Sequence, residues 1–416
     1  MNILIIYSGP LDPMIGMSQV LVFNQIKYLS IHNKVDFANL VSRKTSLEAT
    51  LKRLEPYVNS YYPIKSKSWE KKKFFRAIFL ALRKIIFYLS KKPMEEITLE
   101  FANFKKKILR IIEINKYDVI ILHYWYMGYI LKNLPSSKIK VIIAHDLVEE
   151  FIEVFNKSNY KEIKKLILKR QLQSDLQKQN KYFKQSDLVV VVSNKGKEIV
   201  ESKMPEVNVV LNEIGQDLSE FLEYNIPVDM HSILFYGSLS NHFNKAALER
   251  ILDKIYPGIL ALDSEAKLVI VGSNPPKELL KNYNYPLMTV TGYVDDIKPF
   301  IGKCAVMLLP LERGSGFRGR AVEVMALGVP IVGTRNGFLC TDIQDGIQGY
   351  YAETDKEIIQ KAYMIMKNPG LRKQMSDECR KFVKNKYSLE ATYGKLEQEI
   401  KNLYYLKHKS LNQDNF

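Results

Sequence analysis

The sequence predicts an α/β fold that contains two doubly wound domains. Short runs that are apolar at nearly every position recur along the chain, and each is followed by a longer helical or turn-rich segment. Such runs are typical of parallel strands buried on both faces, and their alternation with helices predicts doubly wound sheets. A chain of 416 residues, 46% of them hydrophobic, also exceeds what one core usually supports.

The expected strands form two series separated by a polar segment. The first series comprises residues 2–7, 35–40, 118–123, 140–144, 187–192 and 208–211, and the second comprises 232–236, 267–271, 288–291, 304–309 and 329–332. Pro227 and several acids interrupt the pattern over residues 212–229. We therefore predict an N-terminal domain over 1–215, a C-terminal domain over 216–387, and a tail over 388–416 whose helix packs back toward the N-terminal domain. Ligands of such sheets bind beyond the carboxyl ends of the strands.

The charge balance favours an anionic partner. Lys and Arg number 61 against 45 Asp and Glu, which gives a formal charge of +16. Nucleic acid, a phosphorylated small molecule or an acidic membrane surface would each fit this sign. No nucleic-acid-binding motif is present, so we expect no nucleic-acid partner.

Cysteine and histidine spacing indicates neither a disulfide framework nor a metal site. Cys304, Cys340 and Cys379 follow no paired spacing, and the six histidines follow no HxxxH spacing. A reducing compartment fits this usage. The chain carries no signal-peptide pattern at its start and no run of about 18 apolar residues. These features predict a cytoplasmic protein, peripheral at the inner face of the cell membrane.

One glycine-rich stretch, GSGFRGRAVEVMALGVPIVGT over 314–334, predicts a phosphate-binding helix start. Its glycines let backbone amides approach a ligand, and the unpaired amides of a helix start attract phosphate. Arg318 and Arg320 add charge-assisted contacts, and Glu323 lies one turn further, where a carboxylate can accept hydrogen bonds from ribose hydroxyls. The alternative is that Arg320 and Glu323 form an ordinary i,i+3 surface pair.

The segment VEVMALGVPIVGT, residues 322–334, resembles the donor-binding region of retaining GT-B glycosyltransferases of family 4. Gly237-Ser238, TGYVDDI at 291–297 and DGIQGYY at 345–351 extend the resemblance in the same sequence order. The resemblance implies two Rossmann-like domains facing a cleft, a UDP- or GDP-sugar donor, retention at the anomeric carbon and no metal or other cofactor. The donor-binding residues that it implies are Gly237, Ser238, Tyr293, Val294, Ser315, Gly316, Phe317, Arg318, Arg320 and Glu323.

Two positions depart from the family pattern. Ser315 stands where the family carries an acid that contacts the donor sugar, and Ser238 replaces an arginine. Lys245 is left as a phosphate partner. We expect Arg318 and Lys245 to act catalytically by stabilising the leaving diphosphate together with Arg320.

The first domain supplies three further candidates. His145 follows the strand expected at 140–144, and the resemblance implies that it contacts the donor sugar as a catalytic residue. Asp146 and Glu149 have the spacing of a helix capping box. Gly16 and Ser18 follow the first strand, where they either form a structural turn or line the acceptor side.

A basic and apolar segment favours an anionic membrane. Residues 71–92, KKKFFRAIFLALRKIIFYLSKK, begin with Lys71, end with Lys92 and combine an apolar body with cations. A helix of this kind suits an anionic bilayer surface. The alternative is a buried helix with snorkelling lysines.

Together these features predict a glycosyltransferase that moves a sugar from a nucleotide-sugar donor to a lipid-linked or membrane-proximal glycan acceptor in bacterial polysaccharide biosynthesis. Ser315 keeps open an inactive nucleotide-sugar-binding scaffold subunit of a glycosyltransferase complex. A nucleotide-sugar epimerase is the third interpretation.

Overall fold

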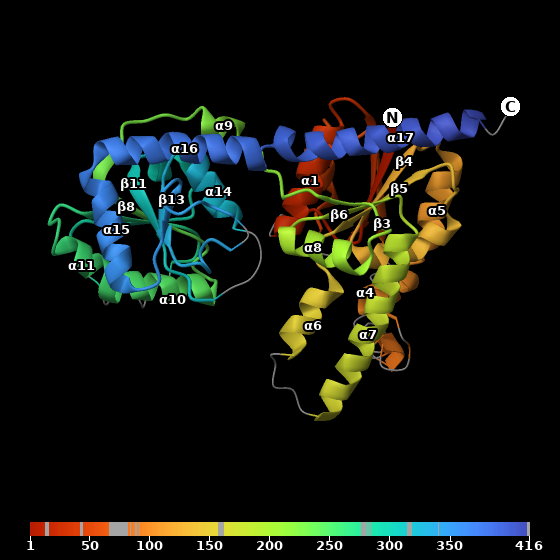
Figure 1. Ribbon diagram of the computed structural model, residues 1–416, viewed down its shortest axis with the longest axis horizontal. Helices are drawn as coiled ribbons and strands as arrows, with labels where there is room; N and C mark the ends of the chain where they lie inside the picture. Colours follow the sequence, from red (N-terminus) through yellow and green to blue (C-terminus); the bar gives the residue numbers. More distant parts are fainter. Residues whose placement is uncertain are drawn as a thin grey trace. The chain divides into compact units, whose positions relative to one another are not determined.

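The chain divides into two units, each built on one parallel sheet with helices on both of its faces (Figure 1). The N-terminal unit comprises Met1–Gly215 and Thr392–Phe416, and the C-terminal unit comprises Gln216–Ala391. The computed structural model describes residues 1–12, 16–41, 45–65, 82–83, 85–87, 90, 92–156, 162–275, 281, 283, 285–313, 318–339 and 341–413. The predicted α/β class with two doubly wound sheets is confirmed.

Seven strands form the N-terminal sheet, in the order β3-β2-β1-β4-β5-β6-β7, and neighbouring strands are parallel. They are β1 (Asn2–Tyr7), β2 (Lys34–Val41), β3 (Ser60–Lys65), β4 (Val119–His123), β5 (Ile139–Ala144), β6 (Leu188–Val191) and β7 (Val209–Leu211). The central strands are apolar on both faces because helices cover both, and Ile3, Ile121 and Val141 are fully buried.

Helices connect these strands and return at the end of the chain. They are α1 (Met17–Leu29), α2 (Leu47–Leu54), α4 (Met94–Phe101), α5 (Phe104–Ile114), the 3-10 helix η2 (Trp125–Asn133), α6 (Val148–Asn156), α7 (Glu162–Lys184), α8 (Asn194–Lys203) and the C-terminal α17 (Lys395–Gln413). Leu396 and Ile400 bury one face of α17, and Asn33 donates to Glu397 over 2.7 Å. The last helix therefore packs onto the N-terminal unit.

Six parallel strands form the C-terminal sheet, in the order β10-β9-β8-β11-β12-β13. They are β8 (Asp229–Tyr236), β9 (Lys267–Val271), β10 (Met288–Gly292), β11 (Cys304–Leu309), β12 (Ile331–Gly333) and β13 (Gly349–Tyr351). The helices are α9 (Ser219–Leu222), α10 (His242–Arg250), the π-helix η3 (Ile251–Ile255), α11 (Tyr256–Leu260), α13 (Lys298–Gly302), α14 (Gly319–Ala326), α15 (Asp355–Lys367) and α16 (Pro369–Tyr387). The π-helix η4 (Glu390–Gly394) contains the point where the chain passes from the C-terminal to the N-terminal unit.

Two edge strands were not among the strands expected from the sequence. β3 has the sequence SYYPIK, in which Pro63 cannot donate to a ladder, and β13 has only three residues, GYY. Each lies at the edge of its sheet, where one side needs no partner. Neither therefore carries the continuous apolar run that marks the buried strands.

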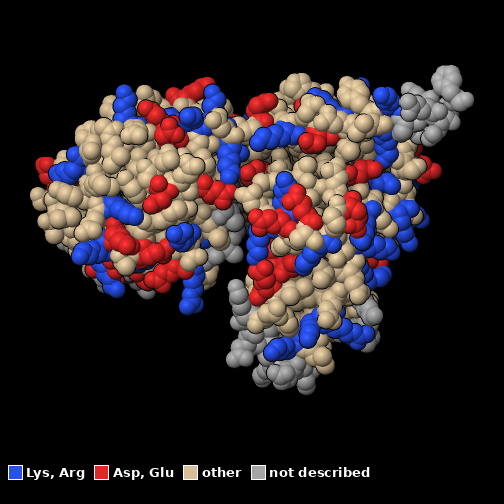
Figure 2. Space-filling model, viewed as in Figure 1, with Lys and Arg blue, Asp and Glu red and all other residues tan. Residues whose placement is uncertain are grey.

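Cationic side chains are spread over the surface, and Lys and Arg gather over α5 (Figure 2). Lys106 and Arg110 of this helix are exposed. Most of the basic segment at 71–92 lies outside the described residues. No described helix combines the length and apolar content needed to cross a bilayer.

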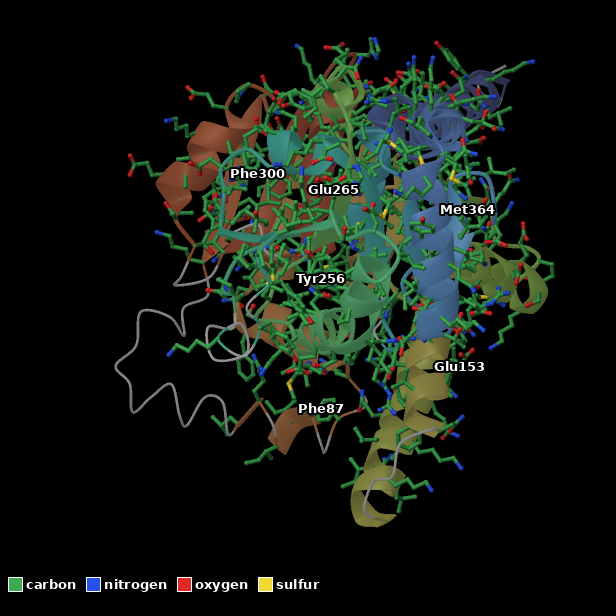
Figure 3. The ribbon with its side chains drawn as sticks, turned by 90° about the vertical axis from the view of Figure 1, so that its left-hand side faces the viewer. Phe87, Glu153, Tyr256, Glu265, Phe300 and Met364 are labelled. Carbon is green, nitrogen blue, oxygen red and sulfur yellow. The ribbon has the colours of Figure 1, made fainter. Side chains whose placement is uncertain are left out.

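The core of the C-terminal unit includes a satisfied polar group. Tyr256, labelled in Figure 3, is fully buried. Its hydroxyl donates to the carbonyl oxygen of Ala266 over 2.8 Å. Because a buried hydroxyl without a partner is costly, this bond lets a large side chain fill the core without penalty.

Candidate functional site

A three-residue cluster lies at the carboxyl end of β8. The hydroxyl of Tyr236, the last residue of β8, donates to the Glu323 carboxylate of α14 over 3.0 Å. The Arg320 guanidinium lies over the Tyr236 ring, 5.4 Å from its centroid. Glu323 is partly buried and Arg320 is exposed. The Arg320–Glu323 surface pair considered from the sequence thus gives way to an arrangement centred on Tyr236.

Burial and the neighbouring groups shift the pKa of Glu323 in opposite directions. Burial raises the pKa of Glu323 overall, and the Tyr236 hydroxyl and the charge of Arg320 offset only part of this rise. Burial and the neighbouring Glu323 charge raise the pKa of Tyr236, so its hydroxyl keeps its proton and remains a donor. A carboxylate held in this way retains acceptor sites for further hydroxyl groups.

Close backbone approach defines the loop after β8. A Cβ on Gly237 would lie 2.9 Å from Nδ2 of Asn244 and 3.6 Å from a guanidinium nitrogen of Arg320. A Cβ on Gly272, which has φ of +156°, would lie 1.8 Å from the carbonyl oxygen of Gly237. Glycine is therefore required at 272 to let two strand ends meet. Gly237 is buried beneath the Tyr236 cluster.

The other predicted donor residues lie around this edge with different exposure. Arg318 is partly buried at the start of α14 and donates to the carbonyl oxygen of Asn336 over 3.3 Å. Lys245 is exposed on α10, 3.9 Å from Glu249. The Ser238 hydroxyl lies 2.9 Å from that of Ser240.

The loop after β10 carries Tyr293 and Val294, two of the predicted donor-binding residues. Tyr293 is 76% exposed, and Val294 is partly buried against the core. An exposed ring of this kind can stack on a planar ligand. Ser315, Gly316 and Phe317 lie outside the described residues.

The N-terminal unit brings two histidines together at the carboxyl ends of adjacent strands. His123 ends β4 and pairs in register with Ile143 of β5, two residues before His145. Nδ1 of His123 lies 2.9 Å from Nε2 of His145. Burial lowers the pKa of His145 to about 3, and burial together with the neighbouring His145 lowers the pKa of His123 well below its usual value. Both imidazoles are therefore neutral at pH 7.

A stack of aromatic rings lies against one face of His145, which is partly exposed. The Tyr124 ring stacks on His145 with 4.2 Å between centroids, and Tyr126 stacks on Tyr124 at 5.2 Å. Tyr124 has a φ of +77°, which is unusual for a residue with a side chain. Such strain persists where the surroundings fix it, as they commonly do at functional sites.

The predicted acceptor-side residues lie at the start of α1. Gly16 is exposed at the N-cap, and its backbone N–H donates to Oε1 of Gln19 over 2.8 Å. Ser18 is partly buried and hydrogen-bonds to the Tyr124 hydroxyl, which joins it to the aromatic cluster at His145.

The capping box expected from Asp146 and Glu149 is wrong. Glu149 is buried and accepts from Nε2 of Gln179 over 2.8 Å, so its carboxylate is used on α7. Glu150 instead accepts from the backbone N–H of Leu147 over 3.0 Å. The reciprocal bond therefore forms one residue later than the spacing indicates.

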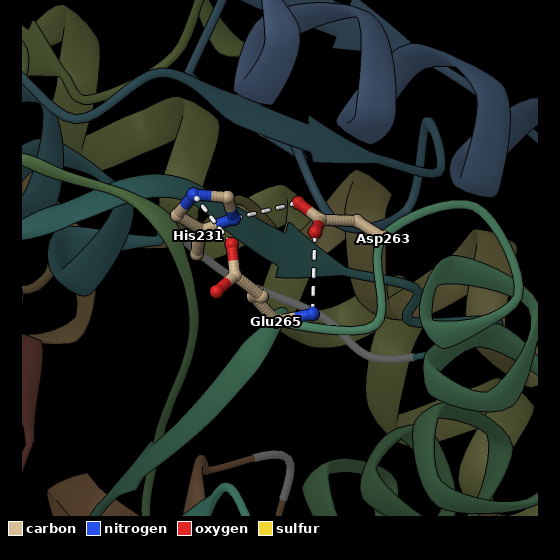
Figure 4. Close-up of side chains that lie close together, drawn as sticks. All are labelled: His231, Asp263 and Glu265. Carbon is tan, nitrogen blue, oxygen red and sulfur yellow. Dashed lines mark hydrogen bonds and ion pairs between the residues drawn. The ribbon is translucent and has the colours of Figure 1, made fainter.

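A cluster of His231, Asp263 and Glu265 lies at the amino ends of strands β8 and β9 in the C-terminal sheet (Figure 4). Nδ1 of His231 lies 2.8 Å from the Asp263 carboxylate, and Nε2 lies 3.7 Å from Glu265. Burial would raise the pKa of Asp263, but the bonds from His231 and from the Glu265 backbone lower it overall. Lys367 lies 3.7 Å from the same carboxylate. The hydrogen bond from His231 and the nearby Lys367 give the Asp263 carboxylate partners within the protein, which favours a structural role.

Solved structures with the same arrangement of sheets and helices show which class of fold the chain has. Sucrose-phosphate synthase from Thermosynechococcus elongatus superposes with a TM-score of 0.65 at 16% identity, covering 98% of this chain and 100% of that one. Anabaena HepE in complex with UDP superposes with a TM-score of 0.64 at 11% identity, covering 97% and 100%. The chain has the GT-B fold of these structures.

Sequence comparison gives a family match in the C-terminal unit. Residues 230–368 match the family model described as Glycosyl transferases group 1. N-acetyl-alpha-D-glucosaminyl L-malate synthase of Bacillus anthracis is 28% identical over 242 residues, 54% of this chain and 60% of the relative. The capsular polysaccharide biosynthesis glycosyltransferase CapM of Staphylococcus aureus is 25% identical over 147 residues, 33% of this chain and 38% of the relative. The matched segments thus span less than two thirds of either relative.

Sequence reasoning missed three residues of these clusters. Tyr236 ends the run SILFY directly before Gly237, and His123 ends the run DVIILH. Tyr124 follows immediately. A polar or titratable side chain at the last position of a buried strand is a usable signal, because that position opens onto the carboxyl edge of the sheet.

Proposed function

We propose that the chain is a glycosyltransferase that uses a nucleotide-sugar donor. The observation that carries this proposal is the Glu323 carboxylate, held by Tyr236 beside Arg320 and the start of α14. It lies within residues 230–368, which match the Glycosyl transferases group 1 family model. HepE, which has the same fold, has been solved with UDP and with UDP-glucose. A UDP- or GDP-sugar is the donor we propose here.

Ribose and diphosphate would occupy neighbouring parts of this edge. The Glu323 carboxylate accepts hydrogen bonds from the two ribose hydroxyls, and the Tyr236 hydroxyl orients it and opposes the rise in its pKa that burial causes. Arg320, Arg318 and the first amides of α14 receive the diphosphate, with Lys245 as a further cation. As the sugar leaves the diphosphate, these fixed charges stabilise the developing negative charge. Cationic side chains fill this role in the proposal, so it includes no metal ion.

The N-terminal unit would supply contacts to the sugar and the acceptor. His145 contacts the donor sugar, and Gly16 and Ser18 line the acceptor side. The Ser18 bond to Tyr124 supports this assignment because it joins the start of α1 to the aromatic cluster that holds His145.

The acceptor we propose is a lipid-linked or membrane-proximal glycan of bacterial polysaccharide biosynthesis, with transfer by retention. The relative CapM is named for capsular polysaccharide biosynthesis, which supports this class. The exposed cations of α5 and the basic segment at 71–92 favour an anionic membrane surface.

Turnover assays test the proposal. The full chain is incubated with UDP- and GDP-sugars and with lipid-linked glycans extracted from bacterial membranes, and release of the nucleoside diphosphate is measured. We expect release that depends on the acceptor and falls about 100-fold in Arg320→Ala, the order found when a positioned transition-state donor is lost. Lys356→Ala, an exposed lysine of the same unit, is the matched control.

Other outcomes identify the alternatives. Turnover that appears only after a partner glycosyltransferase is added would establish the scaffold subunit instead. Conversion of the donor sugar to its epimer without acceptor would establish an epimerase.

A further inference from the structure

His123 is a fully buried histidine to which the proposed reaction gives no role. It ends β4 and is 0% exposed. Its Nδ1 atom lies 2.9 Å from Nε2 of His145. Its other nitrogen, Nε2, is buried and has no hydrogen-bond partner within the described residues.

The two neutral rings share one proton across this contact, so one nitrogen donates and the other accepts. If His145 donated, the proton of His123 would sit on Nε2, where a buried N–H would have no acceptor. If His123 donates from Nδ1, only a lone pair on Nε2 is left without a partner. Buried N–H groups without an acceptor are rarer than buried acceptors without a donor, because burial removes the water that would otherwise accept from the N–H group. The geometry therefore favours donation by His123.

We propose that His123 is a positioning residue that fixes the tautomer of His145, so that His145 presents Nδ1–H as a donor to an oxygen of the bound sugar. This inference rests on the proposed function only in naming the sugar. The Tyr124 ring, stacked on His145 at 4.2 Å, holds the same ring from its face. Edge and face contacts together leave the imidazole one orientation and one tautomer.

The proposed tautomer determines which chemical roles are open to His145. A neutral imidazole that donates from Nδ1 and accepts from His123 at Nε2 has no free lone pair, so His145 does not act as a general base. Burial, which lowers the pKa of both rings, keeps the pair neutral across the physiological range. The matching ligand atom is an acceptor, such as a hydroxyl or ring oxygen of the sugar.

Nitrogen-15 NMR of the full chain tests the tautomer without any ligand. Long-range proton–nitrogen correlation spectra distinguish a protonated from an unprotonated ring nitrogen in each of the six histidines. His145→Asn and His123→Asn identify the two signals by their disappearance. We expect the proton of His145 on Nδ1 and that of His123 on Nδ1 at pH 7. A proton on Nε2 of His145 in the unaltered protein would overturn the proposal.

Two substitutions at 123 separate positioning from packing. His123→Asn keeps an N–H near the place of Nδ1, so His145 should keep its Nδ1–H tautomer. His123→Leu removes the donor, and the Nε2–H form of His145 should become populated. An unchanged tautomer in His123→Leu would overturn the proposal. If this variant does not fold, the unaltered protein and His123→Asn still decide the tautomer.

Binding measurements link the tautomer to the sugar and keep the two proposals distinguishable. In His123→Leu we expect the nucleotide sugar to bind about fivefold more weakly, the order of one hydrogen bond, and the nucleotide alone to bind as before. His123→Asn should restore the sugar-dependent part. If NMR shows the expected tautomer but no nucleotide sugar binds, the role of His123 is supported and the proposed function is contradicted. If the protein turns over the nucleotide sugar but His145 has the opposite tautomer, the proposed function is supported and the role of His123 is contradicted.

Discussion

Single hydroxyl and imidazole groups set the chemistry of both clusters. Glu323 and Arg320 are recognisable in the sequence because they follow a glycine-rich loop, whereas Tyr236 lies 87 residues away from Glu323. Its contact depends on β8 and α14 meeting at one edge of the sheet, which no local pattern encodes. His123 is similar, because its contact with His145 depends on the register of β4 against β5. Residues were predictable where their neighbours in sequence are also their neighbours in space.

Tyr236→Phe should weaken nucleotide binding and make it more sensitive to acid. The Tyr236 hydroxyl lowers the pKa of Glu323, so its removal raises that pKa and leaves less carboxylate at a given pH. We expect binding about fivefold weaker at pH 7.5, the order of one hydrogen bond, and a larger loss toward pH 5.5. Titration calorimetry across this range measures both effects. Tyr285→Phe, whose hydroxyl donates to a backbone carbonyl, is the control. An unchanged pH profile in Tyr236→Phe would contradict the role of this bond.

The paired histidines should make the N-terminal unit less stable in mild acid. Their pKa values in the folded chain lie below the usual 6.5, to about 3 for His145, so the unfolded chain binds protons that the folded one does not. The stability present above pH 6.5 is therefore lost as pH falls. We expect a loss of about 1 kcal/mol per histidine between pH 7 and 5.5.

Urea unfolding followed by tryptophan fluorescence measures this loss, because both tryptophans, Trp69 and Trp125, belong to the N-terminal part of the chain. His145→Asn should flatten the pH dependence, whereas His408→Asn, an exposed histidine of α17, should not. Equal slopes in His145→Asn and the unaltered protein would show that the pair is not buried in its neutral form.

At the scale of elements, burial decides what a sequence pattern reveals. The central strands carry mainly apolar runs because helices cover both of their faces, although Asp36 and Asn39 interrupt β2, and all of these strands were predicted. The edge strands β3 and β13 were missed because a half-exposed strand tolerates Pro63, serine and lysine. Helix starts were less predictable, since the capping carboxylate of α6 is Glu150 and Glu149 is used by α7.

The approach of β9 to the β8 loop should make Gly272→Ala destabilising. A Cβ there would lie 1.8 Å from the Gly237 carbonyl oxygen, a backbone atom that can move only with its strand. We expect the C-terminal unit to lose about 1–3 kcal/mol and the loop at Gly237 to shift. Thermal unfolding and nucleotide affinity should both fall. Gly370→Ala, with no atom closer than 3.4 Å and no positive φ, is the control and should leave both unchanged.

At the scale of the whole molecule, the composition indicated an anionic partner but not which one. The phosphates of a nucleotide and the surface of a membrane both match a charge of +16. The site residues favour the nucleotide in the C-terminal unit, while the cations of the N-terminal unit favour the membrane. Under the proposal, each of the two units on either side of Gly215 would bind one of these partners.

Reversing charges in the basic segment should reduce membrane binding. Each lysine near an anionic surface contributes about 1 kcal/mol, so Lys71→Glu, Lys72→Glu and Lys73→Glu together should lower sedimentation with phosphatidylserine-containing vesicles by about tenfold or more. The same reversal at Lys254, Lys356 and Lys373, exposed lysines of the C-terminal unit, is the matched control. Equal sedimentation of the two triple variants would refute a specific membrane contact by this segment.

The central claim is that Glu323 belongs to a nucleotide site. Calorimetric titration of the full chain with UDP, GDP and their sugar conjugates, repeated with Glu323→Gln and with the exposed Glu312→Gln as control, tests it most directly. We predict saturable binding of one nucleotide class that is weakened about tenfold or more only in Glu323→Gln, since a charged acceptor of two hydroxyls is lost. Absence of binding to every nucleotide tested, or equal binding by Glu323→Gln and the unaltered protein, would contradict the account.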